Sequence, residues 1–349
     1  MIQRIKSSLK RRLGRNRFHF IIPDGVDRPK CLLAYLPVRQ QGWILDYLWR
    51  DLCQKLVLIP GLESGIASSP QDLASQSCGK DVFVIAMGLK HLNELIEMGF
   101  PPERIVFYHT HVRLGIAIKK LDLLHAILVL NGFERELIAM RKVQRDRIHL
   151  FPAGYDEFLF SSPDQQVTRP IDVLFVGRYR RGKDGYYHQR KRYSFQVELA
   201  HQLLDQGKNV AFLGNDWEEC EYALDTRLQL FNVEHLNYGE IYLQSRLVCS
   251  VAGQEGGPVS FLEGMACGCL MVSSPTGFTT DLNADQVACW TLPLVDSAND
   301  WADSIQHILA HNSSPTSDQQ LSRESYLDMA KFSSLALQLV EICWPRADA

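Results

Sequence analysis

The sequence predicts an α/β protein that is built from two doubly wound, parallel-sheet domains in tandem. Short apolar segments of strand length alternate with amphipathic segments of helical period along most of the chain. A polar, proline-containing segment, SSPDQQVTRP at 161–170, divides this series in two. The length of 349 residues suits about two domains, and 46% hydrophobic with 22% charged residues is typical of a folded soluble protein.

The first domain is expected at 26–162, after a basic tail at 1–25. Its apolar segments predict strands at 31–35, 55–59, 82–86, 104–108, 126–130 and 147–151. Amphipathic segments predict helices between them at 43–53, 89–98 and 133–141. Asn131 is expected to cap the last of these helices.

The second domain is expected at 163–318, followed by a C-terminal helix within 319–349. The segments that predict it are strands at 171–176, 210–213, 247–251 and 270–273, with helices at 193–206 and 258–267. In open α/β sheets, ligands bind outside the carboxyl ends of strands. Functional residues are therefore expected directly after the strands.

Charge and cysteine content exclude several classes of protein. Residues 1–23 carry seven arginines and lysines and no acid, whereas the whole chain has a net charge of −3. We expect residues 1–20 to bind an anionic membrane surface, and a frayed, solvated tail is the alternative. We do not expect the chain to bind nucleic acid. Nine cysteines without a CxxC pair indicate a reduced, cytoplasmic protein, and no apolar run has the length of a transmembrane span or a secretory signal.

A basic loop follows the strand at 171–176 and begins with Gly177. The run from Gly177 to Asp184 reads GxxxxGKD, so an acid stands where a nucleotide-hydrolysing P-loop has the hydroxyl that binds magnesium. We therefore expect Arg178 and Lys183 to hold a diphosphate without a metal. A solvated basic loop is the alternative, and no GxGxxG supports a nicotinamide or flavin site.

Two glutamates flank the start of the helix expected at 258–267. Glu255 lies on the loop after the preceding strand, and Glu263 lies within the helix. Pro258 suits the first turn of the helix, and Gly268 suits its end. A helix N-terminus attracts phosphate, and a carboxylate can accept the hydroxyls of a ribose. A nucleotide sugar would use all of these features.

These residues carry a resemblance to a known family. EGGPVSFLEGMACGCLMVSS resembles the EX7E segment of retaining glycosyltransferases of the GT-B fold, in the group 1 or family-four clan. Arg178 and Lys183 are similar to its Arg-x4-Lys clamp, and 129–160 is similar to its domain junction. The long basic loop at 179–192 also resembles a spore-maturation branch of this fold, whereas Gly264 departs from the usual Ala.

The resemblance implies two Rossmann-like domains that face each other across a cleft, with the C-terminal helix packed back on the first domain. It implies that Glu263 holds the donor ribose and that Glu255 holds the transferred sugar. Glu255, Arg178, Lys183 and His111 are expected to act in catalysis. The other expected donor-binding residues are Gly256, Gly257, Pro258, Val259, His109, Gly177 and Tyr238.

We therefore expect a retaining hexosyltransferase that needs no metal and no cofactor. It would transfer a sugar from a nucleoside-diphosphate donor to a glycan or lipid-linked acceptor in cell-surface polysaccharide synthesis. Its location would be the cytoplasm or the inner face of the cytoplasmic membrane. A non-catalytic nucleotide-binding or scaffold protein on the same fold is the main alternative, and an epimerase or phosphorylase is a third.

Overall fold

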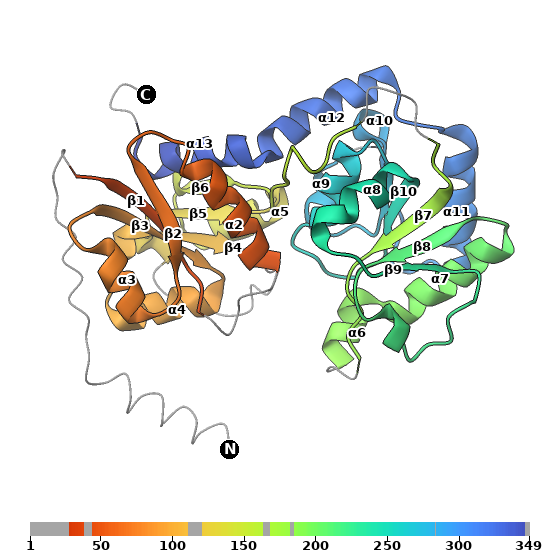
Figure 1. The fold of residues 1–349 in the computed structure, drawn as a ribbon, viewed down its shortest axis with the longest axis horizontal. Coiled ribbons are helices and arrows are strands. Elements are labelled where there is room, and N and C mark those ends of the chain that lie inside the picture. The colour runs from red at the N-terminus through yellow and green to blue at the C-terminus, as the bar shows by residue number, and fades with distance from the viewer. Residues whose placement is uncertain are drawn as a thin grey trace, which may run out of the picture. The chain divides into compact units, whose positions relative to one another are not determined.

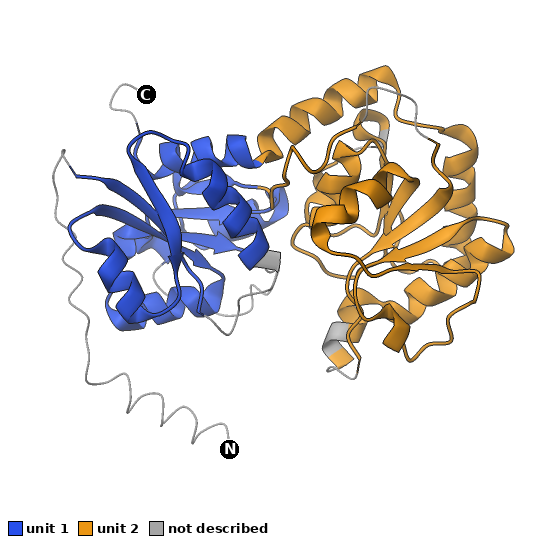
Figure 2. Ribbon diagram, in the orientation of Figure 1, with its two compact units in different colours: residues 1–151, 332–349 blue, residues 152–331 orange. Residues whose placement is uncertain are grey.

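The computed structural model describes residues 28–37, 44–110, 121–162, 168–181, 185–282 and 284–345. The chain forms two compact units (Figures 1 and 2). Unit 1 comprises Met1–Phe151 with Phe332–Ala349, and unit 2 comprises Pro152–Lys331. The expected basic tail at 1–25 lies outside the described residues.

Unit 1 is built on a parallel sheet of six strands in the order β2-β1-β3-β4-β5-β6. The strands are β1 (Lys30–Tyr35), β2 (Leu62–Ala67), β3 (Asp81–Met87), β4 (Ile105–His109), β5 (Ala126–Val129) and β6 (Ile148–Leu150). Almost every residue of β1, β3, β4 and β5 is buried, as expected of strands whose two faces are both covered.

Helices connect these strands, and their ends carry the expected signals. They are α2 (Ile44–Leu56), α3 (Pro70–Ser77), α4 (Leu89–Met98) and α5 (Gly132–Ala139). Asn131 caps α5, as predicted, because its side chain accepts a hydrogen bond from the Glu134 amide at 2.8 Å. Ser69 caps α3 in the same way.

One predicted strand of unit 1 is wrong. The segment 55–59 is the end of α2 and the turn after it, and the strand lies further along as β2. A short apolar run fits either a strand or the end of an amphipathic helix, and here it continues the helix. The sequence of β2, LESGIA, gave no signal because only its first and last residues are buried.

Unit 2 contains a second parallel sheet of six strands, in the order β12-β11-β10-β7-β8-β9. The strands are β7 (Ile171–Val176), β8 (Val210–Leu213), β9 (Gln229–Phe231), β10 (Ser245–Ser250), β11 (Leu270–Ser273) and β12 (Cys289–Thr291). This is the strand order of dinucleotide-binding folds, in which the direction of winding reverses between the two central strands. Here the reversal lies between β7 and β10.

The helices of unit 2 are α6 (Gly185–Lys191), α7 (Tyr193–Asp205), α8 (Tyr238–Leu243), α9 (Val259–Ala266), α10 (Ala284–Val287), α11 (Ala298–His311) and α12 (Ser317–Ala330). Short 3-10 turns lie at Trp217–Glu219 (η5), His235–Asn237 (η6) and Gly277–Asp281 (η7). Trp217 and Trp301 are almost fully buried among the apolar residues between α7, α11 and the sheet.

The C-terminal segment differs from the single helix that the sequence predicted. α12 ends at Ala330, the backbone of Lys331 is extended, and α13 (Phe332–Cys343) follows in unit 1. The expected packing of the C-terminal helix on the first domain is confirmed, because α13 lies against α2. Trp344 Nε1 donates to Asp81 Oδ2 at 2.6 Å and fixes the end of α13 to β3.

The junction between the units also lies earlier than expected. Residues 152–162 belong to unit 2, since the Tyr155 amide donates to the Ala330 carbonyl at 3.2 Å. In the same segment, the Leu159 carbonyl oxygen lies only 2.6 Å from the position that a Cβ on Gly239 would occupy. This close packing of backbone on α8 explains why the segment belongs to unit 2.

Candidate functional site

The loops after β7 and β10 meet where the winding of the unit 2 sheet reverses, which is where doubly wound folds bind ligands. Gly177 follows β7 with φ +149°, a conformation that favours glycine. Its carbonyl accepts a hydrogen bond from Trp217 Nε1 at 2.7 Å. A Cβ on Gly214 would lie 2.5 Å from the same carbonyl oxygen. The turn that begins the basic loop is therefore held tightly.

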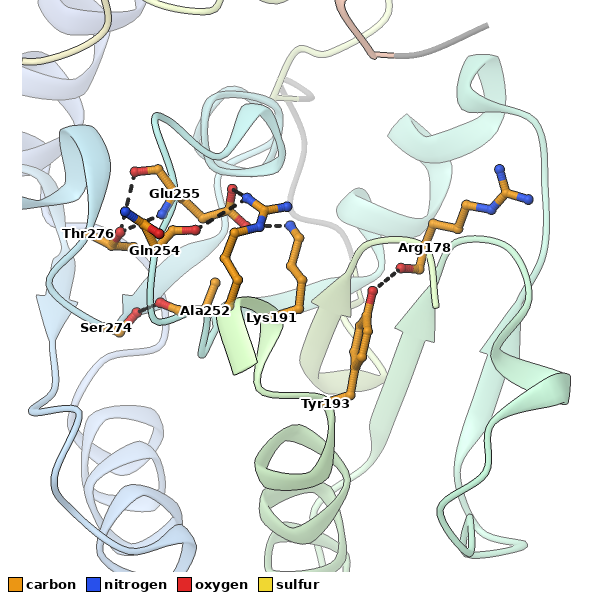
Figure 3. Close-up of polar contacts among 9 residues, drawn as sticks. Arg178, Lys191, Tyr193, Ala252, Gln254, Glu255, Ser274 and Thr276 are labelled. Carbon is orange, nitrogen blue, oxygen red and sulfur yellow. Dashed lines mark hydrogen bonds and ion pairs between the residues drawn. The ribbon is translucent and has the colours of Figure 1, made fainter. Parts of the chain in front are cut away.

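Arg178 does not lie beside Glu255. Its Nε contacts Asp216 Oδ2 at 2.5 Å, and its side chain is 60% exposed. Tyr193 donates a hydrogen bond to its carbonyl at 2.8 Å. In Figure 3 the Arg178 side chain extends away from the cluster around Glu255. Lys183, the second expected cation of the clamp, lies outside the described residues.

Two other cations contact Glu255, both from the end of α6, and one of them, Lys191, is labelled in Figure 3. Arg190 Nη1 lies 3.1 Å from Glu255 Oε2, and Lys191 Nζ donates to Glu255 Oε1. The side chain of Glu255 is 13% exposed. Burial alone would raise the pKa of Glu255, but Lys191 and Arg190 outweigh it and hold this pKa below its ordinary value. Glu255 is thus an ionised carboxylate beside two positive charges.

The backbone around Glu255 is fixed by the loop after β11. The Glu255 amide donates to Thr276 Oγ1 at 2.7 Å, and Ser274 Oγ donates to the Ala252 carbonyl (Figure 3). Gly277 has φ +57°, and a Cβ there would lie 2.5 Å from the Gly256 carbonyl oxygen. Only glycine fits this contact between the two loops. From the other side, the Gly253 amide donates to the Arg190 carbonyl at 2.8 Å.

The second glutamate lies where the sequence placed it, inside the helix that follows this loop. Pro258 is the residue before the first turn of α9, which begins at Val259, one residue later than predicted. Gly268, with φ +78°, follows its end. Glu263 is 3% exposed. Gly256, Gly257, Pro258 and Val259 are all half-buried.

Glu263 is held by two side chains that the sequence analysis did not select. His235 Nε2 contacts Glu263 Oε1 at 2.6 Å, and Tyr242 donates to Glu263 Oε2 at 2.7 Å. Burial, followed by the charge of Glu263, raises the pKa of Tyr238 to about 12 and that of Tyr242 well above its ordinary value. Both tyrosines therefore remain neutral hydroxyl donors at any physiological pH.

The expected histidines belong to unit 1. His109 ends β4 and is 4% exposed, and its Nδ1 lies 3.3 Å from Glu134 Oε2. Glu134 is fully buried and also accepts from the Leu130 amide at 3.3 Å. His109 is therefore packed inside unit 1 against a carboxylate, whereas His111 lies outside the described residues.

The residues that the sequence analysis missed had a weak signal. Arg190 and Lys191 stand directly before α7, in the run RKR at 190–192, where α6 ends on the loop that carries Glu255. The third residue of that run, Arg192, points elsewhere: its guanidinium lies 3.9 Å from the Phe195 ring centroid and donates to the Leu294 carbonyl at 3.2 Å. Composition alone does not separate these three cations.

No helix in the described part of the chain is long and apolar enough to cross a membrane. No group of three or more histidine, cysteine, aspartate or glutamate side chains among those residues is arranged to hold a metal ion.

Part of the chain matches a family of known proteins. Residues 163–326 match the sequence profile of the family Glycosyl transferases group 1, which covers most of unit 2. Comparison with the curated proteins finds no significant match.

Several solved structures share the fold of the whole chain. HepE from Anabaena, in complex with UDP-glucose, is 12% identical and covers 89% of this chain and 98% of its own, with a TM-score of 0.63. Sucrose-phosphate synthase from Thermosynechococcus elongatus is 15% identical, covers 90% and 98%, and has a TM-score of 0.65. A glycosyltransferase from Rickettsia africae is 12% identical, covers 91% and 98%, and has a TM-score of 0.67. The predicted GT-B architecture, with two Rossmann-like units, is therefore confirmed.

Proposed function

We propose that the chain is a glycosyltransferase that moves a sugar from a nucleoside-diphosphate donor to an acceptor hydroxyl. The observation that carries this proposal is Glu255, which is held between Arg190 and Lys191 on the loop after β10. A carboxylate and two cations at the reversal point of a dinucleotide-type sheet suit a ligand with both hydroxyls and phosphates. The match of residues 163–326 to group 1 glycosyltransferases supports the same assignment.

In this proposal the cations of α6 hold the diphosphate. Two positive charges face one carboxylate, so the cluster keeps a net positive charge that an anionic ligand can neutralise. Arg190 and Lys191 would stabilise the charge that develops on the leaving diphosphate, together with the N-terminus of α9. Arg178, paired with Asp216, would join them only after breaking that ion pair.

Transfer would proceed with retention of anomeric configuration and without metal. Glu255 would hold hydroxyls of the transferred sugar, and Gly256 and Gly257 would let it approach the backbone. A glycosidase sets an acid and a second carboxylate on opposite sides of the bond. Here Glu255 and Glu263 belong to one strand–loop–helix unit instead, which favours transfer over hydrolysis.

We further propose a glycan or lipid-linked acceptor at the cytoplasmic face of the membrane. The basic segment at 1–20 supports a surface of anionic lipid as a partner. Co-sedimentation with vesicles that contain anionic lipid should require residues 1–20. Equal binding by the chain with and without that segment would refute this part of the proposal.

The central test combines donor binding with transfer. Calorimetry of the full chain with UDP-, GDP-, ADP- and dTDP-sugars should reveal one preferred donor, and UDP-glucose is tested first because HepE is described with it. E255Q should retain nucleoside-diphosphate binding and lose sugar transfer, whereas D216N, which breaks the exposed Arg178 ion pair, should keep both. Binding without transfer to any offered acceptor would favour a scaffold protein, and donor isomerisation without acceptor would favour an epimerase.

A further inference from the structure

An exposed apolar turn joins α2 to β2 in unit 1. It consists of residues 57–61, and Val57 and Leu58 are 55% and 76% exposed. The backbone of the turn is held firmly, because the amides of Val57, Leu58 and Ile59 donate to carbonyls near the end of α2 at 3.0–3.2 Å. Scattered single hydrophobic residues are ordinary at a protein surface, whereas two adjacent ones on an ordered turn offer a contact for an apolar partner.

The apolar turn lies at the edge of the sheet where β1 also begins. The parallel register pairs Lys30, the first residue of β1, with Leu62 at the start of β2 and with Asp81 at the start of β3. Trp344, which follows α13, reaches the same edge, because its Nε1 donates to Asp81 Oδ2 at 2.6 Å and its ring centroid lies 5.5 Å from Lys30 Nζ. A half-buried tryptophan beside a lysine is typical of surfaces that meet the polar boundary of a bilayer.

This edge also gathers positive charge. Glu63, in β2, is paired with Lys80, whose Nζ lies 2.6 Å from Glu63 Oε2. Asp81 is paired in the same way with Arg104, at 2.7 Å. The chain enters β1 from its basic N-terminal segment, and residues 1–30 carry nine arginines and lysines against two aspartates. Because Glu63 and Asp81 already have cations of their own, they do not neutralise the charge of this segment.

We propose that this edge of unit 1 docks on a bilayer that contains anionic lipid, with Val57 and Leu58 inserted at the boundary between the headgroups and the acyl chains. The inference rests on the proposed function, since it gives the surface that would meet the membrane partner proposed from residues 1–20. Binding of a protein to a membrane surface grows with the apolar area that it buries and with its attraction to anionic lipid, and this edge supplies both. Salt screens the attraction between cations and headgroups, whereas it does not weaken the burial of apolar side chains.

Co-sedimentation of the full chain with vesicles tests the inference. The vesicles consist of phosphatidylcholine with or without phosphatidylglycerol, and the proteins are wild type, V57S/L58S and the control V295S. Val295 is 93% exposed in unit 2, so V295S removes an exposed apolar side chain elsewhere on the chain. We expect V57S/L58S to weaken binding to the phosphatidylglycerol vesicles by about tenfold, and V295S to bind as wild type.

Two further measurements separate insertion of the turn from other effects. In salt concentrated enough to screen the headgroups, wild type should keep part of its binding, and V57S/L58S should keep almost none. L58W should bind the phosphatidylglycerol vesicles more tightly than wild type, because tryptophan favours the bilayer interface. Equal melting temperatures of V57S/L58S and wild type, expected because both side chains are exposed, would show that the weaker binding is not misfolding.

Each opposite result identifies which proposal fails. If V57S/L58S binds the vesicles as wild type does, this inference is wrong, while the proposed role of residues 1–20 stands. If wild-type protein binds neither kind of vesicle, the proposed membrane partner is wrong as well, and donor binding by calorimetry still tests the transferase without lipid. If sedimentation equilibrium shows a dimer for wild type and a monomer for V57S/L58S, and neither binds vesicles, the turn is a contact between copies of the chain and the inference is wrong.

Discussion

Replacing Glu255 by glutamine should measure how strongly its two cations hold the loop after β10. At the Arg190–Glu255 separation of 3.1 Å and an effective dielectric constant of about 20, the gross attraction is about 5 kcal/mol. Desolvation of the charges opposes most of this. Removing one partner costs about 3–5 kcal/mol for a fully buried pair and about 0–1 kcal/mol for an exposed pair. With Glu255 13% exposed and glutamine still able to accept a hydrogen bond, we expect E255Q to cost about 2 kcal/mol.

Thermal unfolding of the full chain by calorimetry provides the assay. A loss of about 2 kcal/mol should lower the transition of unit 2 by about 4–8 °C. D216N is the matched control, since the Arg178–Asp216 pair is shorter, at 2.5 Å, but its side chains are 60% and 33% exposed. Asparagine also tolerates the positive φ of +69° at this position. We expect burial of the ion pair to determine how much stability is lost. Equal losses of stability for E255Q and D216N would refute this expectation.

Three further predictions follow from local contacts. In G264A a new Cβ would lie 2.9 Å from Val248 Cγ2 in the core. The cost of overpacking, about 1–3 kcal/mol, should exceed the gain in helix propensity of about 1 kcal/mol, so we expect a lower midpoint of urea unfolding. A raised midpoint would contradict this. The pKa of Glu255 is held below the ordinary 4.5, so the stability advantage of wild type over E255Q should be complete above about pH 5. This advantage should shrink as the pH falls through 4.5 and below. An advantage that grows in acid would contradict the charge pairing. N131A should lower the free energy of unfolding by about 1 kcal/mol because it removes the cap of α5, whereas N131G should lower it by only a few tenths of a kcal/mol. Urea unfolding measures both losses. Equal losses would show that the cap hydrogen bond is not the cause.

Local sequence signals were sufficient for most of the core strands. β7, β8 and β11 have the bounds that the apolar runs predicted, because each run is buried on both faces and ends at polar or glycine residues. β9 and β12 gave no signal, since each is three residues long and only partly buried. Pairing with a neighbouring strand creates these edge strands, and a neighbour in space cannot be read from a local pattern.

The candidate site divides in the same way. The placement of Glu255 before α9 and of Glu263 within it follows from residues close in sequence, and it could be predicted. The partners of the two glutamates could not. Which cation reaches Glu255 depends on the path of a loop between β7 and α7, and His235 reaches Glu263 from a turn 28 residues away. Such contacts depend on how the elements pack, and the spacing of motifs does not encode them.

The two glutamates are held by different chemistry, and this difference bears on how one site could serve both ends of a nucleotide sugar. Glu255 is held by the charges of Arg190 and Lys191, so an incoming diphosphate can compete for the same cations. Glu263 has a tyrosine hydroxyl and an imidazole as its hydrogen-bond partners, whereas the partners of Glu255 are an arginine and a lysine. A site with this division can rearrange its cations around the diphosphate while the part expected to recognise the ribose keeps its geometry. Breaking the bond between sugar and diphosphate would create negative charge on the diphosphate, beside Arg190 and Lys191. Electrostatic stabilisation of that charge contributes most to catalysis.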